Sequence, residues 1–151
     1  MKNYFQILQI AEHPCIDHSL LQQNYFALQQ QNHPDKSLDN HDLSSDINEA
    51  YAVLNNQFLC ACHWLALRGI NILSDDCKVK PTIDILQQIF TLQNSINKQN
   101  KSEIAIEIKQ QLAVANKQIA TLHQEASLVD FALHLIKMQY LQKTLQNINN
   151  L

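Results

Sequence analysis

The sequence predicts an all-α protein. Among its 151 residues there is one Gly and there are three Pro, so few positions can interrupt a helix. Apolar residues recur at spacings of three and four over most of the chain, and no segment shows the strict alternation typical of a strand. The same shortage of Gly argues against a Gly-rich phosphate loop and a dinucleotide-binding fingerprint.

The chain is expected to begin with a short helical segment followed by a long helix. Residues 4–10 are apolar enough for one or two helical turns. Asp17 is suited to cap a helix that extends to about residue 32, because its carboxylate can accept hydrogen bonds from the first free N–H groups. The polar, turn-rich residues 33–43 are then expected to form a loop.

A second long helix is predicted after this loop. Ser44 or Ser45 is expected to cap it, and Arg68 and Gly69 to end it, since Gly suits the left-handed conformation found at helix ends. Its apolar stripe consists of Ile47, Tyr51, Leu54, Phe58, Ala61 and Leu65. Trp64 and Phe58 are expected in the core.

The second half predicts three antiparallel helices joined by short links, which is typical of a bundle. Residues 69–80 are polar, and Pro81 suits the first turn of the next helix. Residues 97–101 interrupt the apolar pattern after the first of the three helices, and the pattern starts again at Ser102 in the second helix. Residues 123–127 precede the last helix. We therefore expect a first domain at 1–72, a linker at 73–80 and a bundle at 81–151.

Charge argues against a nucleic-acid-binding protein. The formal net charge is −3, and it is uneven, since residues 1–75 carry −5 and the rest +2. Amides replace much of the missing charge, with 19 Gln and 15 Asn against 17% charged residues. No nucleic-acid partner, targeting segment or membrane span is expected.

The cysteines are interpreted as reduced thiols of a cytoplasmic protein. There are four, Cys15, Cys60, Cys62 and Cys77, without a secretion signal. Cys60, Cys62 and His63 could suggest a metal site. However, helical residues two apart do not face each other, and no Cys-x-x-Cys exists, so packed thiols are favoured. Neither a metal nor a cofactor is expected.

The sequence His33-Pro34-Asp35-Lys36 lies in the expected loop between the two long helices. Pro34 fixes its own φ and disfavours helix at His33, so the turn is stiff and projects polar side chains. Asp35 can accept a charge-assisted hydrogen bond from a partner arginine. His-Pro-Asp is also ordinary turn chemistry. With Ile47-Asn48-Glu49-Ala50-Tyr51 following in register, however, the arrangement resembles the J-domain of DnaJ-type co-chaperones.

Further residues narrow the resemblance to the HscB family. They are Asn3-Tyr4-Phe5 near the start and Phe58 to Gly69, which is similar to the family's J-domain end. The resemblance implies a J-domain helical hairpin followed by a three-helix bundle. It also implies two partners: an HscA-type chaperone, whose ATPase the J-domain stimulates, and the iron–sulfur scaffold protein IscU, which the bundle binds and delivers.

The resemblance also implies site residues. His33, Pro34, Asp35 and Lys36 match the chaperone-contacting motif. Residues 84–93 align with the family's scaffold-binding helix, which suggests Ile85, Leu86 and Ile89 as apolar contacts together with Phe90, Gln93 and Tyr140.

The sequence departs from the family at both surfaces. Gln87, Phe90 and Gln93 replace family acids. Helix 17–32 has no Lys or Arg, where J-domains normally present a basic face to an acidic chaperone surface. Electrostatic steering should be reduced accordingly.

Other functions remain as alternatives. No carboxylate pair, nucleophile with a base or phosphate loop stands out, so an enzyme is not expected. A general DnaJ-like co-chaperone, or a helical adaptor in which His-Pro-Asp is coincidental, would share the same fold.

Overall fold

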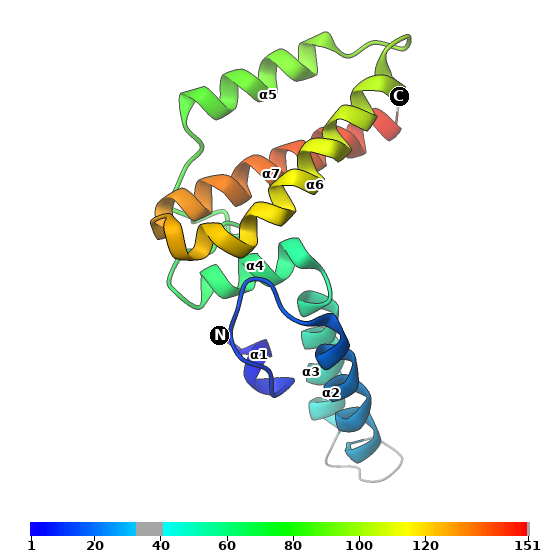
Figure 1. Ribbon diagram of the computed structural model, residues 1–151, viewed down its shortest axis with the longest axis vertical. Coiled ribbons are helices and arrows are strands. Elements are labelled where there is room, and N and C mark those ends of the chain that lie inside the picture. The colour runs from blue at the N-terminus through cyan, green and yellow to red at the C-terminus, as the bar shows by residue number, and fades with distance from the viewer. Residues whose placement is uncertain (33–40, 151) are drawn as a thin grey trace. The chain divides into compact units, whose positions relative to one another are not determined.

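The computed structural model describes residues 1–32 and 41–150, and over these residues the protein has seven helices and no strand (Figure 1). The all-α prediction is confirmed. The chain divides into two compact units, Met1–Gly69 and Ile70–Leu151. Each unit is described by itself below.

The first unit consists of α1 (Tyr4–Ile7), α2 (His18–Gln31), α3 (His41–Leu54) and α4 (Gln57–Ala66). Helix α3 packs against each of the other three. Asp17 caps α2 as predicted, because its carboxylate accepts hydrogen bonds from the backbone N–H groups of Ser19 and Leu20. The largest fully buried side chains of this unit are Phe5, Leu8, Leu21, Ile47, Leu54 and Leu65.

The single long helix predicted from Ser44 or Ser45 to Arg68 is wrong in two respects. Asn56 has an extended backbone and its side chain accepts a hydrogen bond from the N–H of Leu59, so it caps a new helix, α4. Helix α3 also begins earlier, at His41. Ser44 therefore lies inside α3, buried, and its hydroxyl donates to Gln29 Oε1 of α2 at 3.1 Å.

Helix α4 ends at Ala66, before the predicted Arg68 and Gly69. Gly69 does adopt the predicted left-handed conformation, with a φ of 100°. Just before it, Arg68 donates to the carbonyl oxygen of Trp64 at 2.9 Å, and its guanidinium lies 3.9 Å from the centre of the Trp64 ring. Trp64 and Phe58 are buried, as expected. Arg68 thus binds a carbonyl oxygen at the C-terminal end of α4 and packs its guanidinium against the Trp64 ring.

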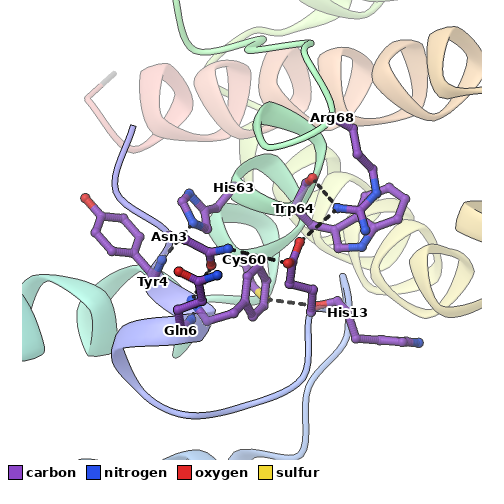
Figure 2. A network of polar contacts seen from close by, with 10 residues as sticks. Asn3, Tyr4, Gln6, His13, Cys60, His63, Trp64 and Arg68 are labelled. Atoms are coloured by element: carbon purple, nitrogen blue, oxygen red, sulfur yellow. Dashed lines mark hydrogen bonds and ion pairs between the residues drawn. The ribbon is translucent and has the colours of Figure 1, made fainter.

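The N-terminal segment is held on α4 by His63 (Figure 2). The backbone N–H of Tyr4 donates to His63 Nε2 at 3.1 Å, so this nitrogen carries no proton. The Tyr4 ring stacks on the imidazole with 4.5 Å between centroids, and the Phe5 ring lies 5.5 Å away. Burial lowers the pKa of His63, against the opposing charge of Glu12. The contact therefore depends on a neutral histidine.

Arg68, just after α4, and Cys60 of α4 also hold residues 12–13 in place (Figure 2). Arg68 Nη1 lies 3.5 Å from Glu12 Oε1, and Asn3 donates to the other oxygen of that carboxylate at 3.4 Å. The Cys60 thiol donates to the carbonyl oxygen of His13 at 3.6 Å. His63 and Cys60 of α4, together with Arg68 just after it, thus hold residues 4–5 and 12–13 in place.

The second unit contains α5 (Ile83–Ser95), α6 (Lys101–Glu125) and α7 (Leu128–Asn149). Helices α6 and α7 form an antiparallel hairpin, and α5 packs against α7 (Figure 1). Ser127 caps α7, and Thr82 caps α5 by accepting from the N–H of Ile85. Pro81 therefore precedes the cap rather than entering the first turn, which corrects the prediction. The core cluster that joins the three helices is Ile89, Ile104, Ile108, Leu141 and Ile148.

The free energy of unfolding should fall as the pH drops below 6.5, the ordinary pKa of histidine. Burial lowers the pKa of His63 in the folded protein, so at intermediate pH the unfolded chain binds a proton that the folded chain does not. The stabilisation is therefore complete above that pH and is lost as the pH falls through the folded-state pKa. Thermal unfolding followed by circular dichroism from about pH 7.5 to pH 5 measures this dependence.

The matched variant is His63→Gln, which keeps an acceptor for the Tyr4 N–H but does not titrate. Its stability should vary less with pH than that of the wild type. His18→Gln, at the exposed start of α2, serves as the control and should retain the wild-type dependence. Equal slopes for the wild type and His63→Gln would contradict the prediction.

Candidate functional site

The residues predicted to contact a chaperone, His33, Pro34, Asp35 and Lys36, lie outside the described residues. The helices on either side of them are firmly paired. The Tyr25 and Tyr51 rings stack with 4.0 Å between centroids, and the Tyr25 hydroxyl donates to Asn48 Oδ1 at 2.7 Å. The tripeptide is thus connected to two helices whose contact is made of aromatic, amide and hydroxyl groups.

Helix α5 divides its apolar side chains between two faces. Ile89 is 4% exposed and belongs to the core cluster, against which Ile85, Leu92 and Ile96 also pack. Ile83, Leu86 and Phe90 lie on the other side, with exposures of 75%, 43% and 65%. A helix with both faces apolar retains a surface able to bind a partner.

The outward face of α5 borders a groove of about 350 Å³. The groove is lined by Ile83, Leu86, Gln87, Ile89, Phe90, Gln93 and Tyr140. Tyr140 comes from α7 and packs against the core cluster. Gln93 is held in place because its amide donates to the Thr144 hydroxyl at 3.3 Å, which in turn donates to the Tyr140 carbonyl oxygen. No lining residue is an acid or a base, so the groove is uncharged.

Most of the predicted scaffold contacts meet in this groove. Leu86, Ile89, Phe90, Gln93 and Tyr140 line it, with Ile89 as its buried floor. Ile85 is different, because it packs against the core cluster and does not line the groove.

Sequence reasoning missed Ile83 as a lining residue. A signal for it exists, since Ile83 lies three residues before Leu86 and seven before Phe90, which places all three on one face of a helix.

Two of the four cysteines, Cys60 and Cys62, are buried. Burial raises the pKa of both Cys60 and Cys62 to about 12, so neither forms a thiolate readily. Among residues 1–32 and 41–150, no group of three or more His, Cys, Asp and Glu side chains is placed to hold a metal ion. Over the same ranges, no helix is long and apolar enough to cross a membrane.

The curated relatives that match this chain carry one and the same name. No protein-family profile matches the chain. The co-chaperone protein HscB homolog of Acinetobacter baylyi is 31% identical over 144 residues, which cover 91% of this chain and 74% of that protein. The homolog of Psychromonas ingrahamii is 27% identical over 93% of this chain and 91% of its own length. Several relatives from Shewanella match over a shorter region, about half of their length, as in strain W3-18-1 with 55%.

The fold agrees with this relationship. The crystal structure of human co-chaperone protein HscB is similar with a TM-score of 0.82 and 20% identity, over 99% of this chain and 82% of the human one. At this identity the likeness concerns the fold alone. The identity to the Acinetobacter homolog, over 91% of this chain and 74% of that protein, shows that the chain belongs to the HscB co-chaperone family.

Proposed function

We propose that this co-chaperone binds an IscU-type iron–sulfur scaffold protein and delivers it to an HscA-type chaperone, whose ATP hydrolysis it stimulates. In this proposal residues 1–72 form the J-domain, residues 73–80 a linker and residues 81–151 the scaffold-binding bundle. The observation that carries the proposal is the position of His33-Pro34-Asp35 between two helices that pack against each other, α2 and α3.

The chemistry of the tripeptide supports a role in contacting a partner. Pro34 limits the conformations of the turn, so less conformational entropy is lost when a partner binds. Asp35 offers a carboxylate that an arginine can bind through two parallel hydrogen bonds. Lys36 follows, as in the family motif. No bond is made or broken by these residues in this proposal, which assigns hydrolysis to the chaperone and requires no cofactor in this chain.

The α5–α7 groove supports the scaffold-binding role. Phe90 and Leu86 are large apolar side chains that remain exposed beside a concave, uncharged surface. Covering a side chain of this size contributes about 1.5–3 kcal/mol. Central aromatic anchors in a pocket account for much of the affinity at protein interfaces. We therefore assign scaffold binding to Leu86, Phe90, Gln93 and Tyr140, with Ile89 beneath them.

We further propose that the protein acts in the cytoplasm. Its four cysteines are free thiols, and Cys60 and Cys62 are buried without forming disulfides. This agrees with a reducing compartment.

One prediction of the proposed function concerns Asp35. Wild-type protein should increase the steady-state ATPase rate of the HscA-type chaperone, and more so when the scaffold is present. Asp35→Asn should abolish this increase, because an amide cannot make the charge-assisted pair with arginine. It should leave thermal stability and scaffold binding unchanged.

Any other outcome of this ATPase experiment favours a different function. Stimulation that does not depend on the scaffold would support a general DnaJ-like co-chaperone. No stimulation by saturating wild-type protein would leave a helical adaptor in which the tripeptide is coincidental. Equal activity of Asp35→Asn and wild type would remove the tripeptide from the mechanism.

The second prediction concerns the groove. Phe90→Ala should raise the scaffold dissociation constant roughly ten-fold, because an apolar side chain of this size contributes more than 1.4 kcal/mol when covered. Leu86→Ala should act in the same direction. Isothermal titration calorimetry measures both.

Ile106→Ala is the matched control, since Ile106 is 57% exposed on α6 and does not line the groove. It should leave the dissociation constant unchanged. Thermal melts should be similar for all three variants, because each removes an exposed side chain. An unaltered affinity in Phe90→Ala would exclude the groove as the scaffold site.

A further inference from the structure

Two cysteines from distant parts of the sequence meet on one side of α4. Cys15 belongs to the segment between α1 and α2, and its sulfur accepts a hydrogen bond from the side-chain amide of Gln57 at 3.7 Å. Cys60 donates its thiol hydrogen to the carbonyl oxygen of His13 at 3.6 Å. Gln57 and Cys60 are three residues apart in α4, so they share one face of this helix. Because His13 and Cys15 are separated by one residue, the two contacts place Cys15 beside Cys60.

The segment that carries Cys15 is fixed in place. The backbone N–H of Cys15 donates to Nδ1 of His13 at 2.9 Å. The ion pair between Glu12 and Arg68, at 3.5 Å, holds the segment just before this turn. On the other side, Cys60 belongs to a helix. Little conformational freedom therefore remains to be lost when the two sulfurs are joined.

The two thiols differ in their access to solvent. Cys15 is partly exposed, whereas Cys60 is only 1% exposed. Burial raises the pKa of the Cys60 thiol to about 12, and the neighbouring Cys15 adds to this rise through its charge. A dissolved oxidant therefore reaches the sulfur of Cys15 first, and Cys60 is a protected thiol beside it.

We propose that Cys15 and Cys60 form a reversible oxidation site, in which a peroxide converts the two thiols into a disulfide. In the first step the Cys15 sulfur attacks one oxygen of hydrogen peroxide, the O–O bond breaks, and a sulfenic acid and water are formed. In the second step the Cys60 sulfur attacks the Cys15 sulfur, the S–O bond breaks, and the hydroxyl leaves as water with the Cys60 proton. The two thiols lose two electrons, which reduce the peroxide. A dithiol reverses the oxidation by thiol–disulfide exchange.

The second step depends on the position of Cys60, because few of its thiols are ionised at neutral pH. Both sulfurs are held in one chain, so their reaction is intramolecular and proceeds at a high effective concentration. Cys62 is not suited to the same role. It lies two residues after Cys60 in α4, and helical residues with this spacing do not share a face.

Mild treatment of the whole chain with hydrogen peroxide tests the inference. Thiol titration after denaturation should show that the wild type loses two of its four free thiols, and dithiothreitol should restore both. Mass spectrometry of the unreduced digest should find the peptides of Cys15 and Cys60 linked. The rate of thiol loss should be the same at about 1 and 20 μM protein, because the link forms within one chain.

Three variants assign the roles of the two thiols. Cys60→Ala should stop the reaction after its first step, so that dimedone labels Cys15 as a sulfenic acid roughly ten-fold more strongly than in the wild type. Cys15→Ser, which changes a partly exposed side chain, should retain its remaining thiols at the same peroxide dose. Cys77→Ser is the matched control, since it removes a partly exposed thiol from the other unit. It should still lose two thiols.

Several results would overturn the inference. They are a wild type that keeps all its thiols, a Cys15→Ser variant that loses thiols as the wild type does, a disulfide that contains Cys62 or Cys77, and links formed only between separate chains. Circular dichroism checks that the variants fold. If Cys60→Ala does not, Cys15→Ser decides alone. None of these experiments requires a chaperone or a scaffold, so the inference and the proposed function are tested separately.

Discussion

Helix α5 buries only one of its faces in the core, and it carries apolar side chains on two. Ile89 is buried in the core cluster with Ile108 and Leu141, which fixes the rotation of the helix about its axis. Burying such a side chain contributes about 1.5–3 kcal/mol, so rotating α5 to cover Phe90 would forfeit that gain. The groove beside Tyr140 is thus a consequence of core packing. Its shape is maintained without any partner.

The first unit obeys a related constraint through α3, which packs against three other helices. Asp46 and Glu49 of α3 meet the N-terminal segment, where Lys2 pairs with Asp46 and the Tyr4 hydroxyl donates to Glu49. The side of α3 toward α2 uses uncharged groups, among them Asn48 and Tyr51. Because a charge buried between helices is costly unless paired, this division lets α2 remain uncharged on both faces.

Much of this fold could be predicted from spacing and caps. Asp17 caps α2 where the sequence indicates, because a short polar side chain before an apolar stripe can accept hydrogen bonds from the first free N–H groups. The last helix, α7, also begins directly after residues 123–127, as its apolar pattern indicates. The break at Asn56 was missed, since Leu54 and Phe58 keep the helical spacing across it and hide the interruption. The choice between Ile89 and Phe90 as the buried residue of α5 also exceeds sequence reasoning. Both are apolar, and only packing against α6 and α7 decides between them.

The α5–α7 groove and helix α2 carry no Asp, Glu, Lys or Arg. Surfaces of this kind select their partners on a different basis from surfaces that form ion pairs. Electrostatic attraction accelerates encounters over long range, whereas uncharged partners associate at about 10⁵–10⁶ M⁻¹s⁻¹. Discrimination must then come from shape and from amides that would be left unpaired against a wrong partner, at about 1–3 kcal/mol each. Gln93 is already held by Thr144 through its amide N–H, and in the proposed complex its carbonyl oxygen would accept a hydrogen bond from a donor on the scaffold. A groove lined by glutamines and by no acid would therefore demand matched hydrogen-bond geometry from the proposed partner, and not opposite charge.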